Sequence, residues 1–186
     1  FKSLQHLKSQ LAYAYISNYD PITIVGKDLN KYISEIRKEV NNLIALEIVQ
    51  YSDKNIILRD FLDIREISIY DTIRRIDRII LSMAEDTKQI MSTGKNDSCN
   101  QIEEKETDVN KLSNLIFKVI KRSFRSQDRA VLKLTLDDIF YYWEITLFLE
   151  KFADQIKRIP RYYTDLKPNL ELVKLYSRII NYYEMA

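Results

Sequence analysis

The sequence has very few residues that break helices or link the chain covalently. Its 186 residues include only two glycines, three prolines and one cysteine. Glycine supplies most tight turns with positive φ and proline interrupts helices, so their scarcity favours long helices over a turn-rich β fold. The single cysteine, Cys99, excludes a disulfide framework within the chain. A chain of this kind is typical of a reducing compartment, and we expect a cytoplasmic protein.

The sequence also lacks an excess of charge of one sign and a long apolar run. It carries 29 basic and 27 acidic residues, a net charge of +2. This balance argues against a dedicated DNA-binding surface. Because the sequence begins with Phe1 rather than Met, we expect DNA contact only through a missing N-terminal domain. No apolar run approaches the ~18 residues of a membrane helix, so no membrane span is expected.

Residue combinations that carry enzyme chemistry are missing as well. His6 is the only histidine and lies far along the chain from Cys99, so no nucleophile–histidine pair is expected. A di-iron carboxylate bundle needs Glu-x-x-His pairs, which do not occur. The turn at Gly26 lacks the repeated glycines and the Lys-Ser/Thr of a phosphate-binding loop. The sequence therefore predicts a protein that is not an enzyme.

The first third of the chain alternates between helical and β-branched segments. The predicted elements are a helix over 2–17, a strand over 22–25, a helix from Asp28 to about 42, and strands over 47–51 and 56–59. Asp28 is the expected N-cap of the second helix. The polar turn 52–55 between the last two strands predicts a β-hairpin. We therefore expect an N-terminal domain, residues 1–62, with a small β-α-β-β unit.

The remaining residues, 63–186, carry only helical patterns. Helices are predicted over 68–91, 103–124, 137–163 and 169–186, with a short helical turn at 129–134. Ser68 is the expected cap of the first, and Thr135 or Asp137 of the third. The first helix has a near-regular 3-4 apolar seam: Ile69, Ile73, Ile76, Ile80, Met83, Thr87 and Ile90. Long helices on short connections predict an antiparallel bundle, so the fold class is α+β and mostly α.

The helix over 137–163 has two apolar rows. One contains Phe140, Trp143 and Leu147, and the other contains Ile145, Leu149, Phe152, Ile156 and Ile159. Two rows predict neighbours on more than one side, with Trp143 buried. Glu150 and Asp154 continue the row of Trp143, because residues four apart lie on one face of a helix.

Two acids at the end of an apolar row need a positive partner, since an unpaired buried charge is costly. One explanation is an ion pair of Glu150 with Lys151 or a neighbouring arginine at the rim of the bundle. The other is a hard cation, which requires further oxygens from facing helices. By register, these oxygens would come from Asp86, Glu106 or Asp108. Both explanations stay open at this stage.

Several segments resemble the PhoU family of phosphate-uptake regulators. The run LEKFADQI at 149–156 resembles the family's helix E-R-x-x-D-H-x-x-x-I-A. The segments 83–86 and 106–112 occupy the places of the family's other bundle helices. The N-terminal segments 15–20, 22–24, 46–49 and 56–60 are similar to its archaeal branch, in which an AbrB-type DNA-binding domain often precedes the PhoU-like part.

This resemblance implies a three-helix repeat with a carboxylate cluster that holds metal ions. Its ligands here would be Glu150, Asp154, Asp86 and Asp108, and the metal a divalent or ferric ion. The sequence departs from the family at Lys151, Gln155 and Asn110, where the family has arginine, histidine and an acid.

The resemblance further implies regulation of phosphate uptake or phosphate signalling through protein contacts, coupled to transcription. The implied partners are a phosphate transporter ATPase or a sensor, and the protein itself would be a homo-oligomer such as a dimer. The alternative is a structural helical bundle that serves oligomerisation of a larger protein.

Overall fold

A computed structural model describes residues 4–94, 98–163 and 169–185. The fold is mostly helical, with a small three-stranded antiparallel sheet near the N-terminus followed by a packed helical bundle, which confirms the predicted fold class. The chain divides into two compact units, Phe1–Thr72 with Lys111–Thr146, and Ile73–Asn110 with Leu147–Ala186. Helices α3 (Ile69–Thr93), α4 (Cys99–Ser123) and α6 (Leu136–Tyr163) contribute residues to both units. The domain boundary expected after residue 62 stays a prediction.

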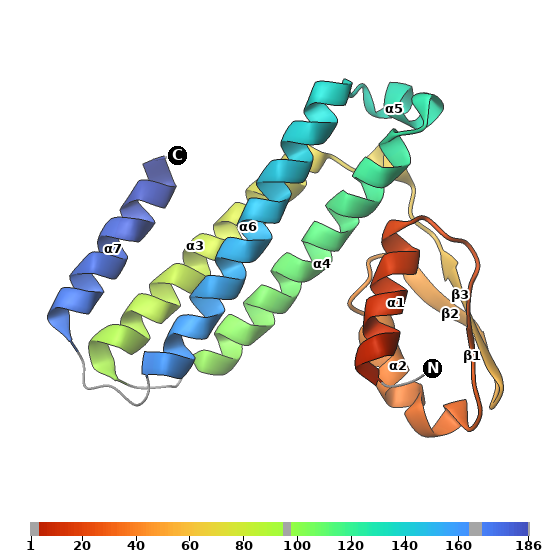
Figure 1. Cartoon of the computed structure of the whole chain (residues 1–186), viewed down its shortest axis with the longest axis horizontal. Coiled ribbons are helices and arrows are strands. Elements are labelled where there is room, and N and C mark those ends of the chain that lie inside the picture. Colours follow the sequence, from red (N-terminus) through yellow and green to blue (C-terminus); the bar gives the residue numbers. More distant parts are fainter. Residues whose placement is uncertain (1–3, 95–97, 164–168, 186) are drawn as a thin grey trace. The chain divides into compact units, whose positions relative to one another are not determined.

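The first unit begins with a β-sheet and the helices that cover it (Figure 1). Its elements are α1 (Leu4–Ile16), β1 (Ile22–Val25), the 3-10 helix η1 (Leu29–Tyr32), α2 (Ile33–Val40), β2 (Leu46–Tyr51) and β3 (Asn55–Asp60). The strand order is β1-β3-β2, and both pairs are antiparallel. β2 and β3 form the predicted hairpin. The strand that comes last in the sequence therefore lies in the middle of the sheet.

One face of this sheet packs against α1 and α2. The buried cluster contains Leu7, Leu11 and Tyr15 of α1, Ile36 and Val40 of α2, and Ile24, Ile56 and Leu58 of the strands. The helical residues recur every four positions and the residues of β3 every two, as each kind of element requires for a single buried face. Burying a side chain of this size stabilises a fold by about 1.5–3 kcal/mol.

Asp28 does not cap a helix, contrary to the prediction. Its backbone is left-handed, with φ of 55°, and its side chain makes no capping hydrogen bond. The carboxylate instead lies 3.3 Å from Nζ of Lys31. Aspartate tolerates the left-handed conformation better than most residues. The chain therefore enters a 3-10 turn first and becomes α-helical only at Ile33.

A buried ion pair ties α4 to this sheet within the first unit. The side chain of Lys118 is fully buried, and its Nζ lies 2.9 Å from Oδ2 of Asp60 at the end of β3. The same ammonium donates to the carbonyl of Tyr15 at 3.0 Å and lies 4.3 Å from the centroid of the Tyr15 ring. Burial lowers the pKa of Lys118, and the hydrogen bond and charge of Asp60 oppose that shift.

Two helix starts use the caps that the sequence predicted. Ser68 Oγ accepts a hydrogen bond from the backbone N–H of Asp71 at 3.1 Å, at the start of α3. Thr135 Oγ1 accepts from the N–H of Asp138 at 3.1 Å, and the Asp138 carboxylate accepts in return from the N–H of Thr135 at 2.7 Å. This reciprocal arrangement is a capping box, which fixes where α6 begins. Before these helices lie η2 (Ile64–Glu66) and α5 (Ser126–Leu132), respectively.

The second unit is a set of packed helices built on the seam of α3. All seven predicted seam residues of α3 are buried, which confirms its register. The C-terminal helix α7 (Leu170–Met185) packs through a few tyrosines. Tyr176 donates its hydroxyl proton to the carbonyl of Ala84 at 3.2 Å, and Tyr183 donates to Asp77 at 2.6 Å. Figure 1 shows α7, in dark blue, beside α3.

The buried row of α6 differs from the predicted one. Phe140 is 65% exposed and Trp143 is 42% exposed, although the Trp143 ring still lies 4.9 Å from that of Phe117. Leu149 and Ile156 of the second predicted row are buried, and the other buried residues of the helix are Ile139, Thr146, Ala153, Pro160 and Tyr163. Small residues such as Ala153 let neighbouring helices approach closely, and a pattern of large apolar side chains does not mark them as buried. Pro160 does not end the helix, which continues to Tyr163.

The buried ion pair can be tested by removing one charge. Asp60→Asn should lower the free energy of unfolding by about 3–5 kcal/mol, because the Lys118 ammonium stays buried without its counter-charge. Urea denaturation measures the change. Asp28→Asn is the matched control and should have little effect, because Asp28 makes no capping hydrogen bond, its partner Lys31 is exposed, and asparagine also tolerates the left-handed backbone. Equal, small decreases in the free energy of unfolding of both variants would show that burial of the Lys118 ammonium does not require the charge of Asp60.

Candidate functional site

A network of charged side chains joins α4 and α6 in the second unit. Glu106 of α4 is buried, with 8% of its surface exposed, and its Oε1 accepts from Nζ of Lys157 at 2.5 Å. The same oxygen accepts from Nδ2 of Asn110 at 2.9 Å, one helical turn further along α4. Lys157 also lies 3.4 Å from Oδ1 of Asp154 on its own helix. One ammonium therefore bridges two carboxylates on two helices.

Further ion pairs extend this network along α4. Lys105 Nζ lies 2.5 Å from Oδ2 of Asp86 on α3 and donates to Oγ of Ser82 at 2.7 Å. Arg161 of α6 lies 2.5 Å from Oε1 of Glu103. Basic residues of α4 and α6 thus meet acids of the facing helices at successive turns. The arrangement holds α3, α4 and α6 together through electrostatic contacts beside their apolar seams.

The four predicted metal ligands have different surroundings. Asp154 pairs with Lys157 and, at 2.6 Å, with Arg158. Asp86 pairs with Lys105, and Asp108 lies on the exposed face of α4. Only Glu150 and Asp154 come close to the buried Glu106. An arginine was expected to pair with Glu150 at the rim of the bundle. The arginine found there, Arg158, pairs with Asp154 instead.

Glu150 is the half-buried acid of this cluster. Within the described part of the chain it forms no ion pair. Burial raises the pKa of its carboxyl, and the nearby charges of Asp154 and Glu106 raise it further, against the opposing effect of Lys151 and Lys157. Glu150 therefore stays protonated to a higher pH than an exposed glutamate.

Sequence reasoning missed the role of Lys157. Its signal was present, because Lys157 and Arg158 follow Asp154 by three and four residues, the spacings at which side chains meet on a helix. Its partner on the facing helix, Glu106, is predicted from the sequence as a source of oxygen for a metal rather than as the acceptor of an ion pair.

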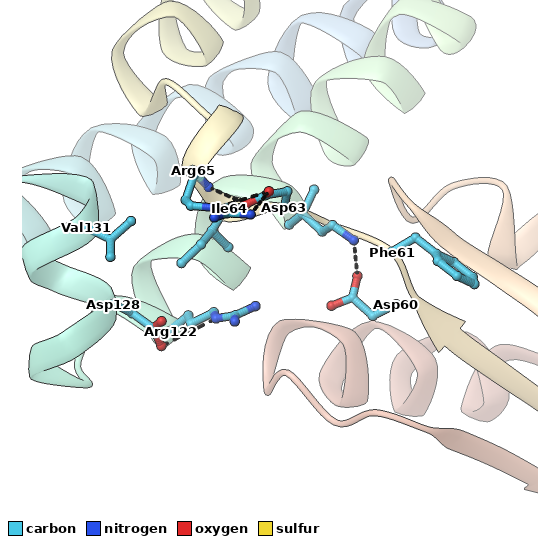
Figure 2. A pocket seen from close by; sticks show the side chains of 9 residues that line it. Asp60, Phe61, Asp63, Ile64, Arg65, Arg122, Asp128 and Val131 are labelled. Atoms are coloured by element: carbon cyan, nitrogen blue, oxygen red, sulfur yellow. Dashed lines mark hydrogen bonds and ion pairs between the residues drawn. The ribbon is translucent and has the colours of Figure 1, made fainter.

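A polar pocket of about 460 Å³ lies in the first unit, between the segment after β3 and the helices α4 and α5. Figure 2 shows its two arginines, each beside an acid. Arg65 pairs with Asp63 at 2.6 Å, and Nε of Arg122 lies 3.4 Å from Asp128. Hydrogen bonds from Arg65 lower the pKa of Asp63 to about 2. Because these charges already compensate one another, the pocket offers no clear binding site for an ion.

Comparison with known families identifies the helices that carry the charged network. Residues 73–162 match the PhoU domain. Neither the curated proteins nor the solved structures gave a match. The matched segment contains Glu106, Glu150, Asp154 and Lys157, so the network lies inside the PhoU domain. The archaeal branch and the link to an AbrB-type domain rest on the sequence resemblance alone.

A PhoU domain suggests a regulatory role in phosphate uptake. Such domains are generally non-catalytic, and the family implies protein partners in the phosphate transport system. No helix in the described residues is long and apolar enough to cross a membrane.

The carboxylates of the segment that matches the PhoU domain do not fit a shared metal ion in the arrangement seen here. A hard cation needs about six oxygen ligands, but Glu106 and Asp154 already contact the ammonium of Lys157. In the ranges 4–94, 98–163 and 169–185 there is no group of three or more histidine, cysteine, aspartate or glutamate side chains that could hold a metal. The predicted metal site stays a prediction.

Glu150 makes the stability of the domain depend on pH. The folded protein has a raised pKa at Glu150, whereas an unfolded glutamate has a pKa of about 4.3. Below pH of about 4.3 this difference stabilises the folded protein, and the stabilisation is lost as the pH rises through the raised pKa. Relative to wild type, Glu150→Gln should therefore gain stability as pH increases and be the more stable protein at pH 7. Melting temperatures between pH 4 and pH 8 measure the difference.

Glu104→Gln is the control, because Glu104 is an exposed glutamate in the same domain. Its difference from wild type should not change over this pH range. A Glu150→Gln curve parallel to that of wild type would contradict the buried position of this carboxyl.

Proposed function

We propose that this protein controls phosphate uptake or phosphate signalling by binding proteins of the phosphate transport system, a transporter ATPase or its sensor. The observation that carries the proposal is the PhoU domain at residues 73–162. The protein acts in the cytoplasm and performs no chemistry of its own. Coupling to transcription requires a DNA-binding domain beyond this sequence, because 29 basic residues are balanced by 27 acidic ones.

Exposed aromatic rings near the start of α6 support action through protein contacts, with Phe140 and Trp143 about one turn apart on one face and Tyr141 on the neighbouring face. Phe140, Tyr141 and Trp143 are all more than one third exposed within the first unit. Aromatic side chains are enriched at protein interfaces and often dominate their binding energy, because they bury a large area with little loss of conformational freedom. We propose that this surface contacts the transport-system partner.

In this function the ion pairs of Lys157 take the place of a metal cluster. The ammonium between Glu106 and Asp154 supplies the positive charge that the carboxylates need. It also leaves Glu150 without a dedicated partner. The domain would therefore present its binding surface without bound metal.

Thermal unfolding in the presence of metal tests this point. A ligand that binds only the folded protein raises its melting temperature by mass action. With Lys157 in place, Mn²⁺ or ferric citrate should leave the melting temperature of the wild type unchanged. An increase that disappears in the Glu150→Gln, Asp154→Asn double variant would instead establish the metal site predicted from the sequence.

The second candidate is a structural bundle that serves oligomerisation. It is favoured by an apolar groove of about 280 Å³ at the ends of α3 and α6 and along α7. Leu172, Leu175, Ile179 and Tyr182 of α7 are exposed beside it at heptad-like spacings. Such a row is typical of a helix that packs against another chain. In this case the protein forms a dimer or larger homo-oligomer.

Phosphate uptake in the host separates the two candidates. Deletion of the gene should change the rate of radiolabelled phosphate uptake, and expression of the wild-type chain should restore it. Phe140→Ser with Tyr141→Ser should fail to restore it, while the folded variant keeps the circular dichroism of the wild type. The matched variant Leu172→Ser with Leu175→Ser should restore it.

Normal uptake in the deletion strain would contradict the regulatory proposal. Suppose that, in addition, light scattering finds an oligomer for the wild type and a monomer for Leu172→Ser with Leu175→Ser. The structural candidate would then replace the regulatory proposal.

A further inference from the structure

The sheet of the first unit has an open edge at β1. Among the residues that the structure describes, β1 pairs with β3 alone, in a continuous register from Ile22 opposite Leu58 to Val25 opposite Asn55. Just beyond the strand, the N–H of Gly26 donates to the carbonyl of Lys54 at 3.1 Å, so Gly26 faces β3. Successive residues of a strand face opposite sides in the plane of the sheet. The N–H and C=O groups of Thr23 and Val25 therefore point away from β3, to the free edge.

The β2 edge of the sheet carries a bulge and a charge, whereas β1, a short strand that follows Pro21, carries neither. β2 has an irregular register between Ile48 and Gln50, a β-bulge, and Glu47 adds a charge. Bulges and charges are common ways to keep a sheet edge from accepting another strand. β1 is uncharged and regular, and its sequence Ile-Thr-Ile-Val consists of β-branched residues that favour pairing.

A groove of about 360 Å³ runs along this open edge. On one side it is lined by five consecutive residues, 21–25. Because neighbouring side chains of a strand point to opposite faces of the sheet, a groove that contacts all five follows the edge of β1 rather than either face. On the other side it is lined by Leu7, Gln10, Leu11 and Ala14, which form a single face of α1. Figure 1 shows α1 and β1 in the N-terminal part of the chain. The groove thus combines unpaired backbone groups with an apolar wall.

We propose that this groove binds an extended peptide segment of a partner protein, which adds to β1 as a further strand. The peptide backbone pairs with Thr23 and Val25, and every second side chain points toward Ala14 of α1 and Ile22, apolar lining residues that are not fully buried. Because none of the described residues that line the groove is charged, the segment that fits is uncharged and apolar at alternate positions. This site lies outside the PhoU domain and does not depend on the function proposed for it.

The position of α1 favours a peptide over a second copy of this chain. Two β1 strands paired by two-fold symmetry would form one continuous sheet with both helix layers on the same face. The α1 helices of both copies would then lie on that face at the junction of the two sheets. Because α1 already lines one side of the groove, the second α1 would compete for the same space. An extended segment without such a helix meets no comparable obstacle.

Peptide selection on the unaltered protein tests the proposal. Heptapeptides are selected from a random phage-displayed library against the full chain, synthesised, and measured by fluorescence anisotropy. The selected sequences should alternate apolar and other residues. Methylation of the peptide nitrogens that face β1 should weaken binding about tenfold each, because each loses one hydrogen bond, and methylation of the intervening nitrogens should not.

Thr23→Pro provides the matching change in the protein. Proline removes the outward N–H of Thr23 and is tolerated on an edge strand, so the variant should fold but bind the peptides at least about tenfold more weakly. Thr23→Val keeps the N–H and should bind as the wild type does. The methylation series needs no variant, so it decides the question even if Thr23→Pro does not fold.

Three results would overturn the proposal. These are a library that yields no alternating peptide, affinities that do not respond to methylation, and a wild-type dimer that Thr23→Pro converts to monomer. The last result would assign the edge to a second copy of the chain.

Discussion

The buried ammonium of Lys118 is the constraint on which the first unit depends. A charge without access to water is tolerated only where opposite charge and hydrogen-bond acceptors surround it. Asp60, the Tyr15 carbonyl and the Tyr15 ring supply these contacts from the end of β3 and from α1. The sheet, its covering helix and α4 must therefore meet in one arrangement, which an apolar contact alone would not specify.

The same principle operates in the PhoU domain, where acids and bases alternate between facing helices. Glu106 is nearly as buried as the apolar seam of α3, yet it has Lys157 and Asn110 as partners. Carboxylates on adjacent helices can be joined by a bound cation or by a basic side chain. This chain has the basic side chain, which agrees with its departures from the family pattern at Lys151, Gln155 and Asn110.

The sequence predicted features that depend on one segment and missed those that depend on two. The seam of α3 and the hairpin of β2 and β3 follow from local periodicity, and the structure confirms them. The buried row of α6 was right at Leu149 and Ile156 and wrong at Phe140 and Trp143. Ala153 and Thr146 are buried through the close approach of neighbours that no single helix reveals. The bridge from Lys157 to Glu106 spans 51 residues of sequence, so its partners could be matched only in three dimensions. For the same reason the open edge of β1 became evident only with the order of the strands.

A lysine that joins two helices has a further consequence for the physiology of the protein. An inorganic ion leaves and returns, so a domain that relies on one becomes loose when the cell is starved of that ion. The ammonium of Lys157 is attached to the chain and cannot be lost by dilution or taken by a competing chelator. Under the function proposed above, the contact between α4 and α6 then does not depend on the supply of a metal ion.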